Sequence, residues 1–147
     1  MAGTDPFANI ARQVEREVFE DSWGNDAANM KDEYGPYDES SLFFLALDTH
    51  EQEPAGVIRM IRNSPAGLKT LVDLDDSIKS PIAPIPVPIG QVMSYHGIDD
   101  LDRCWDGATA VVRQRYRCRL ASIYLQMMRV VYAAASRENV QHLVAVL

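Results

Sequence analysis

The sequence contains few of the residues from which disulfide frameworks, metal sites and membrane spans are built. Its 147 residues include two cysteines, Cys104 and Cys118, which are too few for a disulfide framework or a zinc site. No apolar run approaches the roughly 20 residues of a membrane helix, and the N-terminus lacks the basic and apolar segments of a secretory signal. We therefore expect reduced thiols in a cytoplasmic protein with no membrane partner.

Positive charge and histidine are also scarce. Fourteen Lys and Arg residues stand against 21 Asp and Glu residues, a net charge of −7 that argues against nucleic acid as a partner held by overall charge. The three histidines, His50, His96 and His142, lack metal-ligand spacing, so no metal is expected. Hydrophobic residues make up 47% of the chain, and its length fits one globular domain spanning residues 1–147.

The first segment, residues 6–23, has the periodicity of an amphipathic helix. Asp5 is the expected N-cap and Pro6 suits the first helical position. The expected apolar face comprises Phe7, Ile10, Ala11, Val14, Val18 and Phe19, whereas Arg12, Glu15, Arg16 and Glu17 are placed on the exposed side. Gly24 to Asp26 ends the helix, and residues 27–33 predict a further turn or two.

Two short apolar runs follow, at residues 42–47 and 55–61. The polar segment between them, residues 49–54, has the length of a hairpin connection. These runs predict an antiparallel pair of strands.

Residues 63–106 are predicted to be a long, loop-rich insertion. Residues 68–74 fit a short helix or a short strand. Four prolines lie between residues 81 and 88, which predicts an extended segment because proline donates no backbone hydrogen bond. This segment is either an SH3-type ligand or an extended segment that packs on the surface of the domain. The Ile and Val residues between the prolines favour the second alternative.

Regular structure is predicted again from residue 108 onward. Residues 108–112 fit a strand, 113–119 a basic loop, 121–138 an amphipathic helix and 143–147 a buried strand. A strand, helix and strand with a connection of this length form a parallel βαβ unit. The predicted fold class is therefore α+β, with a mixed sheet that combines antiparallel N-terminal strands with a parallel C-terminal pair.

The basic loop is the most specific local feature of the sequence. Its arginines, Arg113, Arg115, Arg117 and Arg119, occupy alternate positions just before a predicted helix. A helix N-terminus attracts anions, and guanidinium groups bind phosphate well. The loop is therefore either a phosphate site or a solvated basic turn that balances an acidic protein.

The order of the predicted elements resembles the GNAT acyltransferase superfamily. In that family, the turn after the central strand carries a pattern close to Val-x-Pro-x-Tyr-Arg-Gly-x-Gly, with the core Arg/Gln-x-x-Gly-x-Gly/Ala. This chain has Val112, Tyr116 and Arg117 in the matching places, with Leu120 and Ser122 at the two glycine positions of the core. The resemblance implies an acyl-donor site formed by Val111, Val112, Arg113, Arg117, Cys118, Arg119, Leu120, Ala121 and Ser122. It further implies that N–H groups of residues 110–112 polarise the donor carbonyl.

The first half of the chain is similar to the branch of that superfamily that contains acyl-homoserine-lactone synthases and N-acyl amino acid synthases. The matching positions are Arg16, Phe19, Trp23, Glu33, Asp38, Arg59 and Arg62. By this resemblance, Trp23, Glu33, Asp38 and Arg59 form the acceptor site, where Glu33 and Asp38 hold the amine or an N-terminal lid that Arg59 orders. From the residues alone, Trp23 and Phe19 are predicted to be core residues, Asp38 a turn residue and Arg59 a salt-bridged strand residue. The branch's Glu-x-x-Arg run is replaced by residues 106–109, so lactone synthesis is not expected.

The resemblance implies an N-acyltransferase that takes its acyl group from acyl-CoA or an acyl carrier protein and passes it to a small amine or amino acid. No tightly bound cofactor is expected, and no general acid or base is identifiable. The alternative is a non-catalytic GNAT-like binding or assembly module. A GNAT domain continues beyond the strand at residues 143–147, so the sheet is expected to be truncated after its central strand. That strand is expected to pair with a second chain, as in a homo-oligomer, or with a missing segment of a longer protein.

Overall fold

The computed structural model describes residues 1–76 and 88–145. In chain order its helices are α1 (Ala8–Trp23), α2 (Ala27–Tyr34), α3 (Lys69–Asp76), α4 (Ile89–Tyr95) and α5 (Leu120–Arg137), and its strands are β1 (Ser41–Asp48), β2 (Glu53–Arg62), β3 (Cys104–Val112) and β4 (His142–Val144). Short 3-10 helices lie at Gly35–Tyr37 (η1), Leu101–Arg103 (η3) and Gln114–Arg119 (η4). The proline segment of residues 81–87 lies outside the described residues, so neither interpretation of it is tested.

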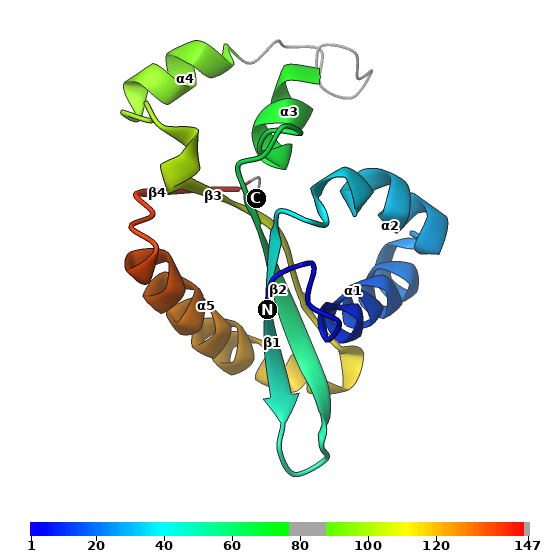
Figure 1. Cartoon of the computed structure of the whole chain (residues 1–147). Helices are drawn as coiled ribbons and strands as arrows, with labels where there is room; N and C mark the ends of the chain where they lie inside the picture. Colours follow the sequence, from blue (N-terminus) through cyan, green and yellow to red (C-terminus); the bar gives the residue numbers. More distant parts are fainter. Residues whose placement is uncertain (77–87, 146–147) are drawn as a thin grey trace.

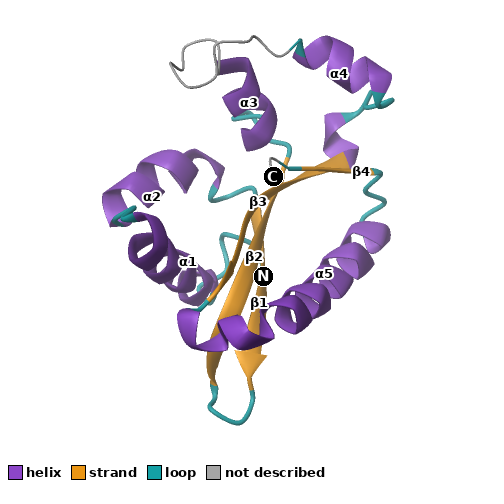
Figure 2. Cartoon of the chain, turned by 180° about the vertical axis from the view of Figure 1, so that it is seen from behind, coloured by secondary structure: helices purple, strands orange, loops and turns teal. Residues whose placement is uncertain are grey.

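The four described strands form one open mixed sheet in the order β1-β2-β3-β4. β1 pairs antiparallel with β2, β2 pairs antiparallel with β3, and β3 pairs parallel with β4. Helices α1 and α5 lie on opposite sides of this sheet, and α3 and α4 lie at the end away from the β1–β2 hairpin (Figure 1 and Figure 2). The α+β class, the antiparallel pair and the parallel βαβ unit are therefore confirmed.

Helix α1 packs on the sheet through small side chains. Ala8, Ala11 and Val14 are fully buried and join Phe43 and Val57 in one core cluster. The helix begins at Ala8, after Asp5 accepts a hydrogen bond from the backbone N–H of Phe7. It ends at Gly24, whose φ of 73° is a left-handed conformation that glycine adopts without strain.

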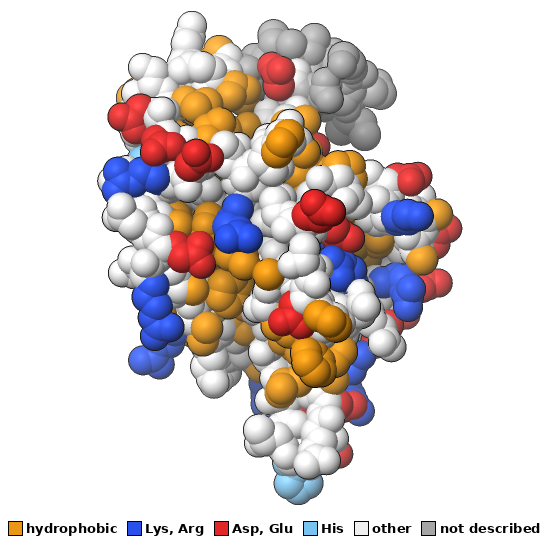
Figure 3. Space-filling view, in the orientation of Figure 1, with side chains coloured by type: hydrophobic (Ala, Val, Ile, Leu, Met, Phe, Trp, Pro, Cys, Tyr) orange, Lys and Arg blue, Asp and Glu red, His pale blue; other side chains and the backbone are white. Residues whose placement is uncertain are grey.

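The predicted apolar face of this helix was wrong at two positions. Phe7 is 67% exposed and Ile10 is also exposed, because both lie outside the stripe of small residues that faces the sheet. Met1 is exposed as well, and Figure 3 shows hydrophobic side chains at the surface near the start of α1.

Aspartate side chains cap helix α2 and close the hairpin turn. Asp26 caps α2, since its side chain accepts hydrogen bonds from the N–H groups of Ala28 and Asn29, each at 2.9 Å. The hairpin turn is closed in the same way by Asp48, which accepts from the N–H groups of His50 and Glu51.

The insertion predicted at residues 63–106 contains more structure than expected. It holds α3, α4 and the first residues of β3, so assigning Cys104 to Asp106 to a loop was wrong. These residues are strand because they pair with the end of β2 on one side and with β4 on the other. Of the two alternatives for residues 68–74, the structure has the helix.

Helix α5 buries only one narrow face. Met127, Val131 and Ala135 join Trp105 and Ile58 in the second core cluster. Leu125 and Tyr132, which the sequence predicted to be buried, are exposed because they lie on the flank of the helix.

Strand β4 lies at the edge of the described sheet. It covers His142–Val144, two residues of the predicted strand lie outside the described part, and Leu143 is 36% exposed. Pairing of this strand with another chain stays a prediction.

Candidate functional site

The central strand β3 carries a β-bulge next to β4. Arg59 of β2 pairs with Thr109, but the next residue, Met60, pairs with Gly107, so Ala108 is an extra residue without a partner on β2. A bulge of this kind frees backbone groups from the ladder and bends the strand. Sequence reasoning missed it, although Gly107 at this point is the type of residue that marks a bulge.

Within the described residues, the pairing between β3 and β4 ends at Asp106, next to the bulge. The two strands pair only from Cys104 to Asp106 on β3, and within the described part no further residues of the two strands pair. A cavity of about 390 Å³ opens there, which we call the β3–β4 cavity. It is lined by Ile58 and Met60 of β2, residues 107–110 of β3, Tyr124, Met128 and Tyr132 of α5, and residues 143–145.

The chemistry of the β3–β4 cavity combines an apolar wall with free backbone groups. Its side chains are aliphatic, thioether, hydroxyl or aromatic, and none of them is charged. The edge of β3 that faces β4 supplies N–H and C=O groups beyond Asp106, where strand pairing has ended. Such a cavity suits an acyl chain with a polar carbonyl held at the bulge.

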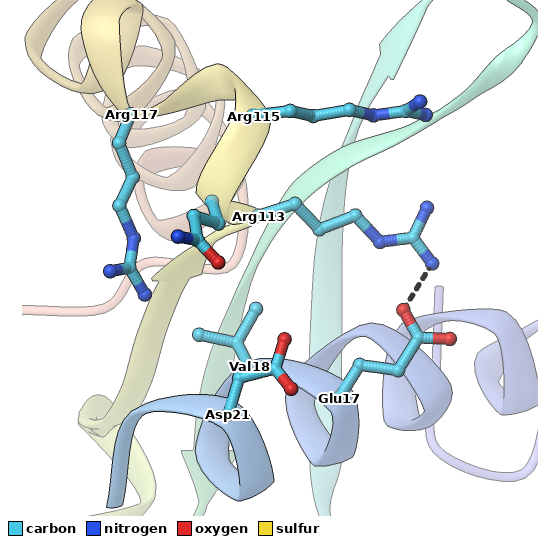
Figure 4. Close-up of a pocket in the computed structure, with 7 residues that line it drawn as sticks. Glu17, Val18, Asp21, Arg113, Arg115 and Arg117 are labelled. Carbon is cyan, nitrogen blue, oxygen red and sulfur yellow. Dashed lines mark hydrogen bonds and ion pairs between the residues drawn. The ribbon is translucent and has the colours of Figure 1, made fainter.

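The arginine turn adopts a 3-10 helix, η4, where the sequence predicted a loop. With α1 it encloses a pocket of about 530 Å³, lined by Glu17, Val18, Asp21, Arg113, Gln114, Arg115 and Arg117. Figure 4 shows Arg113 and Glu17 pointing toward one another, whereas Arg115 and Arg117 extend in different directions from the turn. The four arginines therefore do not converge on one point.

Two of the four arginines are neutralised by carboxylates. Arg113 forms an ion pair with Glu17 at 2.6 Å and donates to the carbonyl of Pro54, and Arg115 pairs with Glu53. Arg117 donates to the hydroxyl of Ser22 at 2.7 Å. Arg119 forms no ion pair within the described residues. Only Arg117 and Arg119 of this turn thus lack a carboxylate partner in the described part of the chain.

The predicted acyl-donor residues fall into two groups. Val111 and Val112 are buried in β3, on the α1 side and the α5 side of the sheet respectively. The exposed group lies where η4 meets α5 and comprises Arg117, Cys118, Arg119, Leu120, Ala121 and Ser122. Leu120 is the first residue of α5, and no side chain caps that end of the helix. The 3-10 helix η4 continues directly into α5, because the N–H of Leu120 donates to the carbonyl of Arg117. What this end of α5 offers an anion is the positive end of the helix dipole together with the neighbouring arginines.

The predicted acceptor residues Arg59 and Asp38 lie together on the α1 side of the sheet. Arg59, 3% exposed, donates to Glu15 at 2.6 Å and to Asp38 at 3.2 Å. Its guanidinium carbon also lies over the rings of Tyr34 and Phe43, 4.9 and 4.7 Å from their centres. Arg59 is thus a salt-bridged strand residue in contact with four side chains, as the residues alone predicted; its role in ordering a lid stays a prediction.

The other two predicted acceptor residues lie apart from this pair. Glu33 forms an ion pair with Lys69 of α3 at 3.1 Å. Trp23 is 64% exposed and packs on the ring of Phe19, with 4.8 Å between ring centres. The prediction that Trp23 is a core residue was wrong, because it is the last residue of α1 and extends beyond the packed part of the helix.

Sequence reasoning missed two buried carboxylates. Glu15, placed on the exposed side of α1, is fully buried and accepts hydrogen bonds from Arg59 and from the hydroxyl of Thr109. Asp106 is also fully buried, and both the N–H and the hydroxyl of Thr70 donate to it, so β3 caps the start of α3. The positions of Val14 and Val18 around Glu15 were the available signal, since all three share one side of the helix.

The described residues contain neither a metal-binding cluster nor a membrane span. Among them, no group of three or more His, Cys, Asp or Glu side chains is placed to hold a metal ion. In the same part of the chain, no helix combines the length and the apolar character needed to cross a membrane.

Comparisons with known proteins do not place the chain in a family. No protein-family model, no curated protein sequence and no solved structure matches it. The geometry of the site is therefore the basis on which a function can be proposed.

The buried carboxyl of Asp106 predicts a dependence of stability on pH. Burial raises its pKa above the ordinary value, opposed by the hydrogen bonds from Thr70. The folded chain therefore holds this proton to higher pH than the unfolded chain, so the linked stability is lost as pH rises through the raised pKa. We expect the free energy of unfolding of the natural chain, relative to that of Asp106→Asn, to fall as the pH rises above about 4, the ordinary pKa of this carboxyl. Urea denaturation at a series of pH values measures the difference. If the natural chain instead gains stability over Asp106→Asn as the pH rises, the pKa of Asp106 is not raised in the folded chain.

Proposed function

We propose that this chain is a GNAT-like N-acyltransferase domain. It transfers an acyl group from acyl-CoA or an acyl carrier protein to the nitrogen of a small amine or amino acid. The observation that carries the proposal is the β3–β4 cavity, which joins an uncharged wall to a bulged strand with free backbone groups. An acyl thioester requires both features, an apolar space for the chain and hydrogen-bond donors for the carbonyl oxygen.

In this reaction, the bulge stabilises the negative charge that develops on the carbonyl oxygen. The amine nitrogen attacks the thioester carbonyl, a C–N bond forms, and the C–S bond breaks to release a thiol that gains the proton lost by the amine. Negative charge develops on the carbonyl oxygen during the attack. Backbone N–H groups at Ala108 and its neighbours are fixed in place by β3 and stabilise that charge.

The start of α5 supports the same proposal, because it suits the phosphate-bearing end of the acyl donor. Arg117 and Arg119 have no carboxylate partner among the described residues, and they lie at the positive end of the dipole of the 18-residue helix α5. Charge of this sign suits the phosphates of coenzyme A or of a phosphopantetheine arm.

The test of this proposal is donor binding by a charge-reversal variant. We expect octanoyl-CoA, titrated by calorimetry, to bind the natural chain and to bind Arg117→Glu/Arg119→Glu about tenfold or more weakly, because two phosphate contacts become repulsive. The matched control is Arg129→Glu/Arg137→Glu, which makes the same change of charge further along α5. Equal affinity of the two variants would remove the arginine turn from the donor site.

A second function, a non-catalytic binding or assembly module, is favoured by one specific observation. Leu120 and Ser122 place side chains where the family pattern has glycine, and Arg113 and Arg115 are already ion-paired. A module of this kind predicts no saturable donor binding by the natural chain, whereas the enzyme requires it.

A further inference from the structure

A second cavity lies on the other side of the sheet, between α1 and α2. Its volume is about 390 Å³, within the range of small-molecule sites. Arg59 of β2 lies at its base, whereas the β3–β4 cavity is bounded by α5 on the opposite side of the sheet. We call it the α1–α2 crevice. Two residues of the expected acceptor site, Asp38 and Arg59, line it, but the site proposed below depends on Arg16 and Lys31, which the acyl transfer does not use.

The α1–α2 crevice carries more positive charge than negative charge. Four cations line it, Arg12, Arg16, Lys31 and Arg59, against the two carboxylates of Glu15 and Asp38. A surplus of two positive charges is unexpected in one place on a protein whose net charge is −7. Figure 3 shows Lys and Arg side chains over α1 and α2, among Asp and Glu side chains.

The two carboxylates are already satisfied by the inner pair of arginines. Glu15 is bound by Arg59 and Thr109, and Asp38 is bound by Arg59 and Arg12, each at 3.2 Å. Arg12 is further fixed by the carbonyl of Gly3 at 2.7 Å. The inner charges therefore balance, and the surplus belongs to Arg16 and Lys31.

Arg16 and Lys31 have no ion-pair or side-chain hydrogen-bond partner within the part of the chain that the structure describes. They come from different helices, α1 and α2, and line the same crevice. Two cations that line one crevice repel each other, and an anion placed between them relieves that repulsion. A guanidinium and an ammonium together offer several donors to an oxyanion.

We propose that the α1–α2 crevice is a binding site for a small organic dianion, a phosphate monoester or a dicarboxylate. Arg16 and Lys31 bind its two negative charges, and the fixed guanidinium of Arg12 adds a third cation. The ligand links α1 to α2 and so stabilises the N-terminal half of the fold.

The experiment uses the full chain and three simple anions. Phosphate, malonate and acetate are titrated at matched ionic strength, with the melting temperature and calorimetric binding as readouts. We expect saturable binding of phosphate or malonate, with the tighter of the two identifying the ligand's chemistry, and little effect of acetate. In Arg16→Gln/Lys31→Gln, that binding is expected to weaken about tenfold or more.

The control variant is Arg129→Gln/Arg137→Gln, which removes the same charge from exposed positions of α5 and is expected to keep full affinity. The proposal is overturned if acetate acts as strongly as the dianions, or if both double variants lose affinity equally, since either result means screening of the whole protein's charge. It is also overturned if Arg16→Gln/Lys31→Gln binds normally. These measurements need no acyl donor, so their outcome does not depend on whether the chain is an acyltransferase.

Discussion

Replacing Glu15 by alanine is expected to destabilise the fold by about 3–5 kcal/mol, since it leaves the buried charge of Arg59 without its main partner. Glu15 accepts hydrogen bonds from Arg59 and from Thr109, and the exposed fractions of the Arg59 and Glu15 side chains are 3% and 1%. Water cannot replace the lost carboxylate at that depth. Urea denaturation followed by circular dichroism measures the change.

The matched control for Glu15→Ala is Glu17→Ala on the same helix. Glu17 also forms an arginine ion pair, with Arg113 at 2.6 Å, but its side chain is 39% exposed. Its loss is expected to cost no more than about 1 kcal/mol, because solvent screens an exposed pair. If the two variants lose equal stability, the buried network does not hold α1 on the sheet.

Filling the β3–β4 cavity from Gly107 is expected to abolish donor binding at the proposed site. A Cβ at Gly107 would lie 3.4 Å from the Cβ of Ala145 and 3.8 Å from the Cε of Met60, which is ordinary contact. Gly107→Ala is therefore expected to bind octanoyl-CoA nearly as well as the natural chain. Gly107→Phe places a ring in the cavity and is expected to weaken binding roughly 100-fold, measured by calorimetry.

A second filling variant separates loss of the cavity from loss of the fold. Met128→Trp enters the same space from α5 and leaves β3 unchanged. Both filled variants are expected to retain the circular dichroism spectrum of the natural chain while losing donor binding. Normal binding by folded Gly107→Phe and Met128→Trp would show that the acyl group lies elsewhere.

The order and type of most elements could be predicted from the sequence, because local signals determine them. Asp26 and Gly24 mark helix ends through capping and left-handed geometry, and the apolar runs of β1 and β2 flank a hairpin-length polar segment. The parallel pairing of β3 and β4 followed from the length of the connection between them.

The features that define the candidate sites were not predictable, because they depend on contacts between distant segments. The first three residues of β3 are strand only through pairing with β2 and β4. Glu15 looked like a surface residue of α1 until Arg59 and Thr109, 44 and 94 positions away, were placed beside it. The bulge at Ala108 likewise appears only in the register between two strands.

The arginine turn shows both what the sequence predicts and what it leaves open. The alternating arginines correctly indicated a basic segment before a helix. They did not reveal that Glu17 and Glu53 neutralise Arg113 and Arg115, because these carboxylates come from α1 and β2. Only the partners of each side chain distinguish a charge that binds a ligand from one that stabilises the fold.

The most direct test of the proposed acyl-donor site is an NMR titration of the natural chain with octanoyl-CoA. If the acyl group enters between β3 and β4, the backbone amide signals of Gly107 to Ala110 shift and saturate with the donor concentration. The amides at the start of α5 shift along the same binding curve, since one molecule spans both places. Saturable binding that leaves residues 107–110 unchanged, or no saturable binding, would contradict the proposed donor site.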